Sequence, residues 1–235
     1  MTVGRSSHRL VERLANSLMM RRILPTIERG DNPVTPYRLS FTVGGLLSEY
    51  ARIGVDAFDD TGSWVGARKL MRGRNLLQVP TASSATRITS ELVDRLSVLS
   101  AQEIEVVRDG TADDRATIMW VATARYYRII FEFASEVVRS RFLARETTLR
   151  LSDIDAFFAR LSGIAPEVAG LSEGTRLKLR QNLMRMLREA SIVDTSGTIQ
   201  PALPSVQVSA ALAASGPDSF LVLPMSDELI ARMMG

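Results

Sequence analysis

One stretch of the sequence carries side chains that could bind nucleic acid. With Ser172 as N-cap, residues 173–190 form about five turns of helix. Its candidate DNA-binding residues are Arg176, Lys178, Gln181, Arg185 and Arg188, the last four falling together on one side. Such side chains can meet phosphates and base edges in a major groove. The pattern therefore predicts a DNA-contacting helix, and it also fits a solvated face in an arginine-rich chain.

The other side of this helix is apolar and is followed by a hairpin-like pattern. The expected buried stripe is Leu179, Leu183, Met186, Leu187 and Ala190. After it come Ile192-Val193, a turn at 195–197, and Thr198-Ile199, which predict a short strand, a turn and a second strand. A basic helix followed by a small hairpin predicts a winged-helix-like domain.

A looser helix-turn-helix pattern lies between Ser63 and Leu96, where two expected helices flank a turn at Pro80. In the second helix the apolar positions leave Thr86 and Arg87 outside, near the helix start. Hydroxyl and guanidinium groups there can contact phosphates. They are also ordinary residues for a helix start, so both interpretations remain open.

Residues 111–150 show a long helical pattern. Apolar residues recur there every three or four positions, so Trp120, Tyr126 and Tyr127 are interpreted as packing residues rather than as a platform for stacked bases. Arg139 and Arg141 near its end either extend a phosphate-binding surface or are solvated.

Together the patterns predict a mainly α fold with a small β hairpin or sheet. We expect four pieces: a basic helical arm (1–36), a helix-turn-helix-like N-terminal domain (37–110), a central long helix (111–150) and a winged-helix-like C-terminal domain (151–235). The remaining expected elements are helices at 43–58, 83–99 and 101–107, the last with a Ser100/Glu103 capping box, a short helix opened by Ser152 with Asp155, an extra strand at 220–223 and a terminal helix at 227–234.

Positive charge is concentrated in three parts of the chain. The net charge is +3, and residues 1–36, 120–150 and 172–190 each carry three more basic than acidic residues. Only Lys69 and Lys178 are lysines. Arginine suits bidentate contacts to phosphate and guanine, although the nucleotide composition of a gene can produce the same bias.

Several classes of protein lack their usual residues in this sequence. Without cysteine there are no disulfides, thiolate zinc sites or cysteine nucleophiles, and His8 is the single histidine. No phosphate-binding Gly-x-x-x-x-Gly-Lys-Ser/Thr loop is present. We therefore expect no catalytic residues, no cofactor and no metal, and hence not an enzyme. No apolar run is long enough to cross a bilayer, so no membrane partner and a cytoplasmic location are expected.

An ordered set of segments resembles the BrxA family of bacteriophage exclusion (BREX) systems. The matching stretches are Tyr37–Leu47, Asn75–Gln78, Ser83–Arg87, Tyr126–Arg128, Asp153–Phe158 and, above all, Leu171–Asp194. The resemblance implies a non-enzymatic component of a phage-defence system, encoded beside a DNA methyltransferase, a large ATPase and a phosphatase-like protein. It also implies a fold similar to NusB-type antitermination factors, which suggests RNA as a rival ligand.

The sequence thus favours a duplex-DNA-binding component of phage defence. Two alternatives remain: a scaffold whose basic face docks an acidic partner within the defence assembly, and an RNA-binding protein of the antitermination type.

Overall fold

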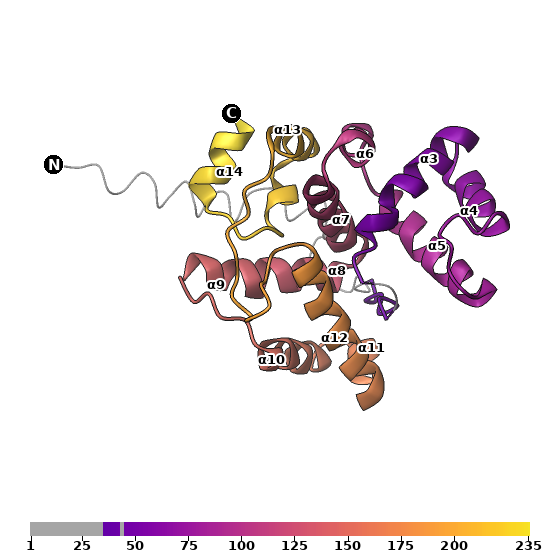
Figure 1. The fold of residues 1–235 in the computed structure, drawn as a ribbon. Helices are drawn as coiled ribbons and strands as arrows, with labels where there is room; N and C mark the ends of the chain where they lie inside the picture. Colours follow the sequence, from indigo (N-terminus) through magenta and orange to yellow (C-terminus); the bar gives the residue numbers. More distant parts are fainter. Residues whose placement is uncertain (1–34, 43–44) are drawn as a thin grey trace. The chain divides into compact units, whose positions relative to one another are not determined.

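The computed structural model describes residues 35–42 and 45–235, and their regular elements are all helical (Figure 1). In chain order they are a 3-10 turn η1 (Ser48–Tyr50), α3 (Ala51–Thr61), α4 (Trp64–Gly73), α5 (Ala82–Leu96), α6 (Ala101–Asp109), α7 (Ala112–Tyr126), α8 (Arg128–Glu132), a π-helical segment η2 (Phe133–Arg139), α9 (Ser140–Leu143), α10 (Leu151–Ser162), α11 (Pro166–Ala169), α12 (Glu173–Glu189), α13 (Val206–Ser215), a 3-10 turn η3 (Pro217–Phe220) and α14 (Asp227–Met234). Residues 1–34 of the expected arm, and 43–44 of an expected helix, lie outside the described residues.

Hydroxyl side chains begin most of the longer helices. Each of these N-caps accepts a hydrogen bond from the backbone N–H three residues further on, which satisfies a donor that the first helical turn leaves free: Ser63, Thr81, Ser100, Thr111, Ser172, Ser205 and Ser226. The expected Ser100/Glu103 capping box is confirmed, as is Ser172 at the start of α12. The expected Ser152/Asp155 box is wrong, because the N-cap of α10 is Arg150, two residues earlier, and Asp153 accepts from the Arg150 N–H (2.7 Å).

The long helical pattern at 111–150 is divided into four helical segments. Tyr127 leaves the helical conformation (φ −112°, ψ 96°) between α7 and α8, and η2 follows with π-helical bonding. Tyr127 is fully buried and its hydroxyl donates to Glu91 in α5 (2.6 Å), so the break is fixed by packing and by this hydrogen bond. Trp120 is also fully buried and donates its indole N–H to the Val222 carbonyl oxygen (2.8 Å). Both rings therefore pack as expected.

An extended stretch without helical structure, residues 37–42 and 45–47, contacts several helices, and we call it the crossing segment. Tyr37 donates its backbone N–H to Glu167 in α11 and its hydroxyl to Glu132 in α8 (both 2.6 Å). Burial and the bond to Glu132 raise the pKa of Tyr37 to about 12, so this hydroxyl remains a donor at neutral pH. Further along, Asn182 of α12 donates to the Phe41 carbonyl oxygen (2.5 Å). The crossing segment thus joins elements that are distant in sequence.

The expected hairpin after α12 is wrong. The described residues contain no strand; in their place are two isolated bridges, Val193 with Ile199 and Thr148 with Thr198. The carboxylate of Asp194 accepts the backbone N–H groups of Ser196 and Thr198 (both 2.9 Å) and so closes the turn itself. Two-residue strands are too short to build a ladder. The prediction of a small sheet and of a winged helix is therefore corrected to an all-helical fold.

The C-terminal part differs from expectation in two further elements. Residues 220–223, expected as a strand, are the end of η3 and a turn in which Phe220, Val222 and Leu223 are buried. Helix α13 is not among the expected elements; Ser205 caps it and its alanine-rich sequence favours a helix. The terminal helix at 227–234 is confirmed.

A buried guanidinium gives a test of how the crossing segment is held. Arg95 is fully buried, donates to Glu91 (2.7 Å) and donates Nη1 to the Gly45 carbonyl oxygen (2.7 Å). Arg95→Ala leaves a buried carboxylate and a carbonyl group without their partner, so we expect a loss of about 3–5 kcal/mol in the free energy of unfolding, measured by denaturant titration. The matched control Arg68→Ala breaks a partly exposed pair with Asp94 and should cost less than about 1 kcal/mol. Equal effects of the two variants would contradict this interpretation.

The contact between α6 and α13 predicts a pH dependence of stability. Burial alone would raise the pKa of Glu103, but hydrogen bonds from Arg125, the Ser100 N–H and Ser215 outweigh it and hold the pKa below its ordinary value of 4.5. The stabilisation is therefore present above pH 4.5 and lost as pH falls through the lower, folded-state pKa. We expect Glu103→Gln to lower the melting temperature at pH 7 and to flatten its decline below pH 4.5. An unchanged acid limb would show that Glu103 does not contribute to it.

Candidate nucleic-acid interface

Helix α12 presents one face to the core and the other to solvent. Leu179, Leu183, Met186 and Leu187 are buried as expected, whereas Ala190 at the C-cap is only partly buried. Met184 is buried as well, so the apolar stripe is wider than the spacing predicted. Figure 1 shows α12 crossing beside α10 and α11, with its C-terminal end near α8.

The opposite face of α12 carries four exposed polar side chains, which we call the α12 stripe: Lys178, Gln181, Arg185 and Arg188. Among the described residues, no carboxylate lies within ion-pair distance of Lys178 or Arg188. Arg185 is different, because its Nε donates to Glu189 Oε1 (2.6 Å). The structure therefore leaves two unpaired positive charges on the stripe, one near each end, with an amide and a paired guanidinium between them.

Arg176 lies apart from the stripe. It is half-buried, and its guanidinium donates to the Ser162 hydroxyl and to the Val168 carbonyl oxygen (both 3.3 Å). Arg180, on the same flank, pairs with Asp155 in α10 (2.5 Å). These two arginines hold α12 against the α10–α11 region through Nη2 of Arg176 and Nη1 of Arg180.

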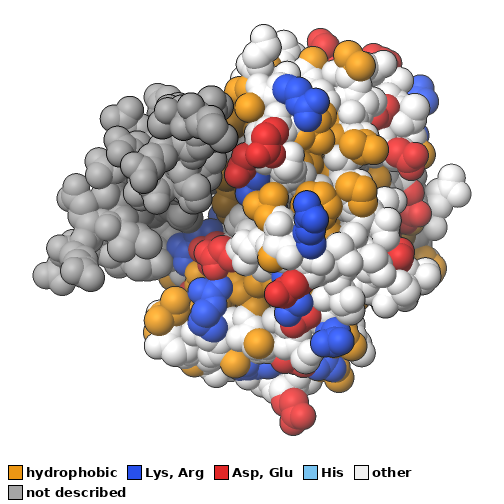
Figure 2. All heavy atoms as spheres, turned by 90° about the vertical axis from the view of Figure 1, so that its left-hand side faces the viewer, with side chains coloured by type: hydrophobic (Ala, Val, Ile, Leu, Met, Phe, Trp, Pro, Cys, Tyr) orange, Lys and Arg blue, Asp and Glu red, His pale blue; other side chains and the backbone are white. Residues whose placement is uncertain are grey.

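Arg139 and Arg141 also have partners within the protein. Arg139 pairs with Asp227 of α14, and its side chain is only 11% exposed. Arg141 pairs with Asp153 of α10 (2.7 Å) and donates to the Thr148 carbonyl oxygen. Figure 2 views the side of the molecule that carries α9 and α14, and on the described part of this face basic and acidic side chains are intermixed rather than gathered into a basic patch.

Thr86 and Arg87 are exposed, as expected, in the first half of α5. Figure 1 shows α5 and α9 at opposite sides of the described structure, with α12 between them in the view. The structure therefore does not bring the candidate residues into one patch. Those of α12 form a stripe, those of α5 lie separately, and Arg139 and Arg141 join other helices.

Two contacts of Glu189 were not predicted from the sequence: the ion pair with Arg185 and the hydrogen bond from Leu46. Glu189 contacts both the stripe, through Arg185, and the crossing segment, through the Leu46 N–H (2.5 Å). The four-residue spacing from Arg185 to Glu189 was a readable sign of the ion pair. The approach of residues 45–46 has no local sign, because these residues lie more than 140 positions away in sequence.

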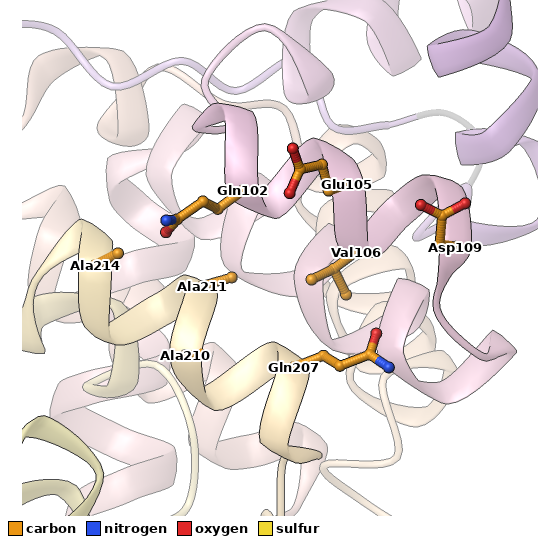
Figure 3. A pocket seen from close by; sticks show the side chains of 8 residues that line it. All are labelled: Gln102, Glu105, Val106, Asp109, Gln207, Ala210, Ala211 and Ala214. Carbon is orange, nitrogen blue, oxygen red and sulfur yellow. The ribbon is translucent and has the colours of Figure 1, made fainter.

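A surface pocket of about 420 Å³ lies between α6 and α13 (Figure 3). Alanines of α13 form one wall, and Gln102, Glu105 and Asp109 of α6 form the other. Both carboxylates are exposed, so this pocket would repel a phosphate backbone. Its chemistry is therefore opposite to that of the α12 stripe.

No group of three or more His, Asp or Glu side chains in the described ranges could hold a metal ion. No helix in that part of the chain is long and apolar enough to cross a membrane.

The described part of the chain is helical and carries the basic helix α12, and several known proteins are similar to it. A crystal structure of an uncharacterized protein from Magnetospirillum magneticum superposes with a TM-score of 0.67 at 19% identity, over 80% of this chain and 97% of that one, which shows a shared fold. The family model BrxA matches residues 35–216. The chain therefore belongs to the BrxA family, as its resemblance implied.

Two relatives carry the name "BREX protein BrxA". One, from Bacillus cereus (strain H3081.97), is 31% identical over 116 residues, which is 49% of this chain and 58% of that protein. The other, from Escherichia coli O9:H4 (strain HS), is 24% identical over 155 residues, or 65% of this chain and 71% of that protein. The Bacillus match thus spans a little over half the length of that relative.

The surroundings of the arginines predict effects of different size on stability. Arg139→Ala removes a guanidinium that is only 11% exposed and leaves the half-exposed Asp227 without its partner, so we expect a loss of about 1–3 kcal/mol in the free energy of unfolding. Arg188→Ala, at an exposed position on α12, should change it by less than about 0.5 kcal/mol. Chemical denaturation of both variants measures the difference, and a larger loss for Arg188→Ala would contradict these assignments.

Proposed function

We propose that this protein is a non-enzymatic component of a BREX phage-defence system and that it binds duplex DNA through the α12 stripe. The relatives named as BREX proteins support the first part of the proposal. The observation that carries the second part is the pair of exposed cations, Lys178 and Arg188, which have no carboxylate partner among the described residues and lie on one face of a helix whose other face is anchored in the core.

The dimensions of the stripe suit a DNA groove. Lys178 and Arg188 are ten residues apart, which corresponds to about 15 Å along the helix axis. A major groove about 12 Å wide admits such a helix. Cations near the two ends of the stripe can then neutralise phosphates, while Gln181 and Arg185 face the base edges between them. Arg176, Arg139 and Arg141 act within the fold and contribute to this surface only through its positioning.

The proposal of a non-enzymatic role rests on residue chemistry. The chain has one histidine and no cysteine, which leaves few candidates for a general base or a nucleophile. The pocket between α6 and α13 is lined by carboxylates, amides and alanines, and its negative charge does not suit a phosphate. A scaffold that docks other BREX proteins, and an RNA-binding protein, are the rival functions that the following experiment distinguishes.

The test compares Lys178→Ala/Arg188→Ala with a charge-matched control, Arg52→Ala/Arg74→Ala, which removes two exposed cations on α3 and after α4. Binding to a labelled duplex is titrated by fluorescence anisotropy at several salt concentrations. We expect the slope of log affinity against log salt to shrink by about 1.8 for the α12 variant, because each phosphate contact contributes about 0.9. The control should keep the wild-type slope.

Three outcomes would contradict the proposal. A wild-type protein that does not bind duplex DNA removes DNA binding altogether. An unchanged slope in the folded α12 variant moves the interface elsewhere on the protein. More effective competition by duplex RNA than by duplex DNA of the same sequence favours the antitermination-type function.

A further inference from the structure

Glu189 uses both of its carboxylate oxygens, and it uses them on two different parts of the molecule. Oε1 accepts from Arg185 Nε (2.6 Å), and Oε2 accepts from the Leu46 backbone N–H (2.5 Å). The arginine is on the exposed stripe and Leu46 is fully buried. The carboxylate is therefore a fixed link between the core and a solvent-facing guanidinium.

The core side of this link is rigid. The carbonyl oxygens of Gly45 and Leu46 accept from Nη1 of Arg95 (2.7 and 3.2 Å), and Arg95 is itself fully buried against Glu91. Gly45 has φ +64°, and a Cβ added there would lie 2.5 Å from Glu189 Oε2 and 2.9 Å from Arg185 Nε. Only glycine allows the backbone to approach the pair so closely.

This arrangement fixes the orientation of the Arg185 guanidinium and offsets its positive charge. Nε is occupied, while the side chain is 59% exposed, and no described residue accepts from Nη1 or Nη2. These two groups are therefore free at the outer end of the guanidinium. Because Glu189 offsets most of the positive charge, the pair adds little to long-range attraction of phosphates. Lys178 and Arg188 differ from Arg185: each keeps its net charge, and no ion pair with a described residue fixes the orientation of its side chain.

We propose that Arg185 reads a base in the DNA that the stripe binds, with guanine as its target, and that Glu189 is the positioning residue. The inference rests on the proposed DNA binding. Two parallel N–H donors match the O6 and N7 acceptors that guanine presents in the major groove. A guanidinium whose rotation is already restricted loses less conformational freedom when it makes this pair. Arg185 thus supplies discrimination, while Lys178 and Arg188 supply affinity.

The test is a selection from randomised duplexes, followed by affinity measurements on the preferred site. Each guanine of that site is replaced in turn by 7-deazaguanine, which lacks the N7 acceptor. For the wild-type protein we expect one guanine at which the replacement weakens binding by about 5- to 100-fold. Arg185→Met keeps most of the side-chain length and removes every donor, so it should bind the unmodified and the modified duplex equally. Lys178→Ala is the matched control, and it should weaken binding to both duplexes by the same factor.

Glu189→Gln tests the positioning role separately. It removes the negative charge, so we expect the salt slope to steepen by up to about 0.9 while the preference for guanine falls. A purely structural role of Glu189 would lower the melting temperature without steepening the slope. Thermal melts accompany both measurements, and Arg185→Met, at an exposed position, serves as the variant whose folding is not at issue.

The outcomes separate the two proposals. If the wild-type protein binds no duplex DNA, the proposed function fails and this inference fails with it. If it binds DNA but selects no guanine, or if Arg185→Met keeps the wild-type preference, only the inference is overturned. A Glu189→Gln variant with an unchanged slope and unchanged preference would remove the positioning role.

Discussion

The burial of the Arg95 guanidinium is the constraint on which much of this structure depends. A buried cation is tolerated only when its charge is paired and its donors are satisfied. Glu91 supplies the charge from the same helix, but the Gly45 and Leu46 carbonyl oxygens come from the crossing segment. Tyr127 donates to the same carboxylate, and burial together with the negative charge of Glu91 raises the pKa of its hydroxyl, which keeps it protonated. The hydrogen bonds that join helix α5, the crossing segment and the break between α7 and α8 therefore form together or not at all.

The orientation of α12 follows from the same constraint. Its buried leucines determine which face meets the core, but apolar packing alone permits small rotations and shifts along the helix axis. Hydrogen bonds have narrower geometric requirements. Asn182 donates to the Phe41 carbonyl oxygen and Glu189 accepts from Leu46, both on the crossing segment, so α12 is fixed at two points more than one turn apart. The exposed stripe is thus oriented in part by Phe41 and Leu46, which are fully buried.

The sequence correctly predicted features that depend on residues close together in the chain. The capping box at Ser100, the start of α12 at Ser172 and the two faces of α12 all depend on residues within a few positions of one another, and the structure confirms them. The expected hairpin was wrong because Ile192, Val193 and Ile199 are apolar for packing rather than for pairing in a ladder. The partners of the arginines could not be predicted either. Asp227 pairs with Arg139 across 88 positions, and no spacing rule connects such residues. Charge counted along the sequence therefore overstated the positive surface near α9.

The π-helical segment η2 sets the side-chain register of α9. A π turn holds more residues than an α turn, so every side chain after it is rotated about the helix axis relative to an uninterrupted α-helix, by about 100° for each extra residue. Arg139 ends this segment and faces Asp227 of α14, whereas Arg141, two residues later, faces Asp153 of α10. If η2 adopted regular α-helical bonding without losing a residue, the following side chains would turn out of phase with their carboxylates. The π turn thus absorbs a residue that a regular α-helix would not need, and a family member with one residue fewer here could continue as an α-helix and keep the same ion pairs to its last helix.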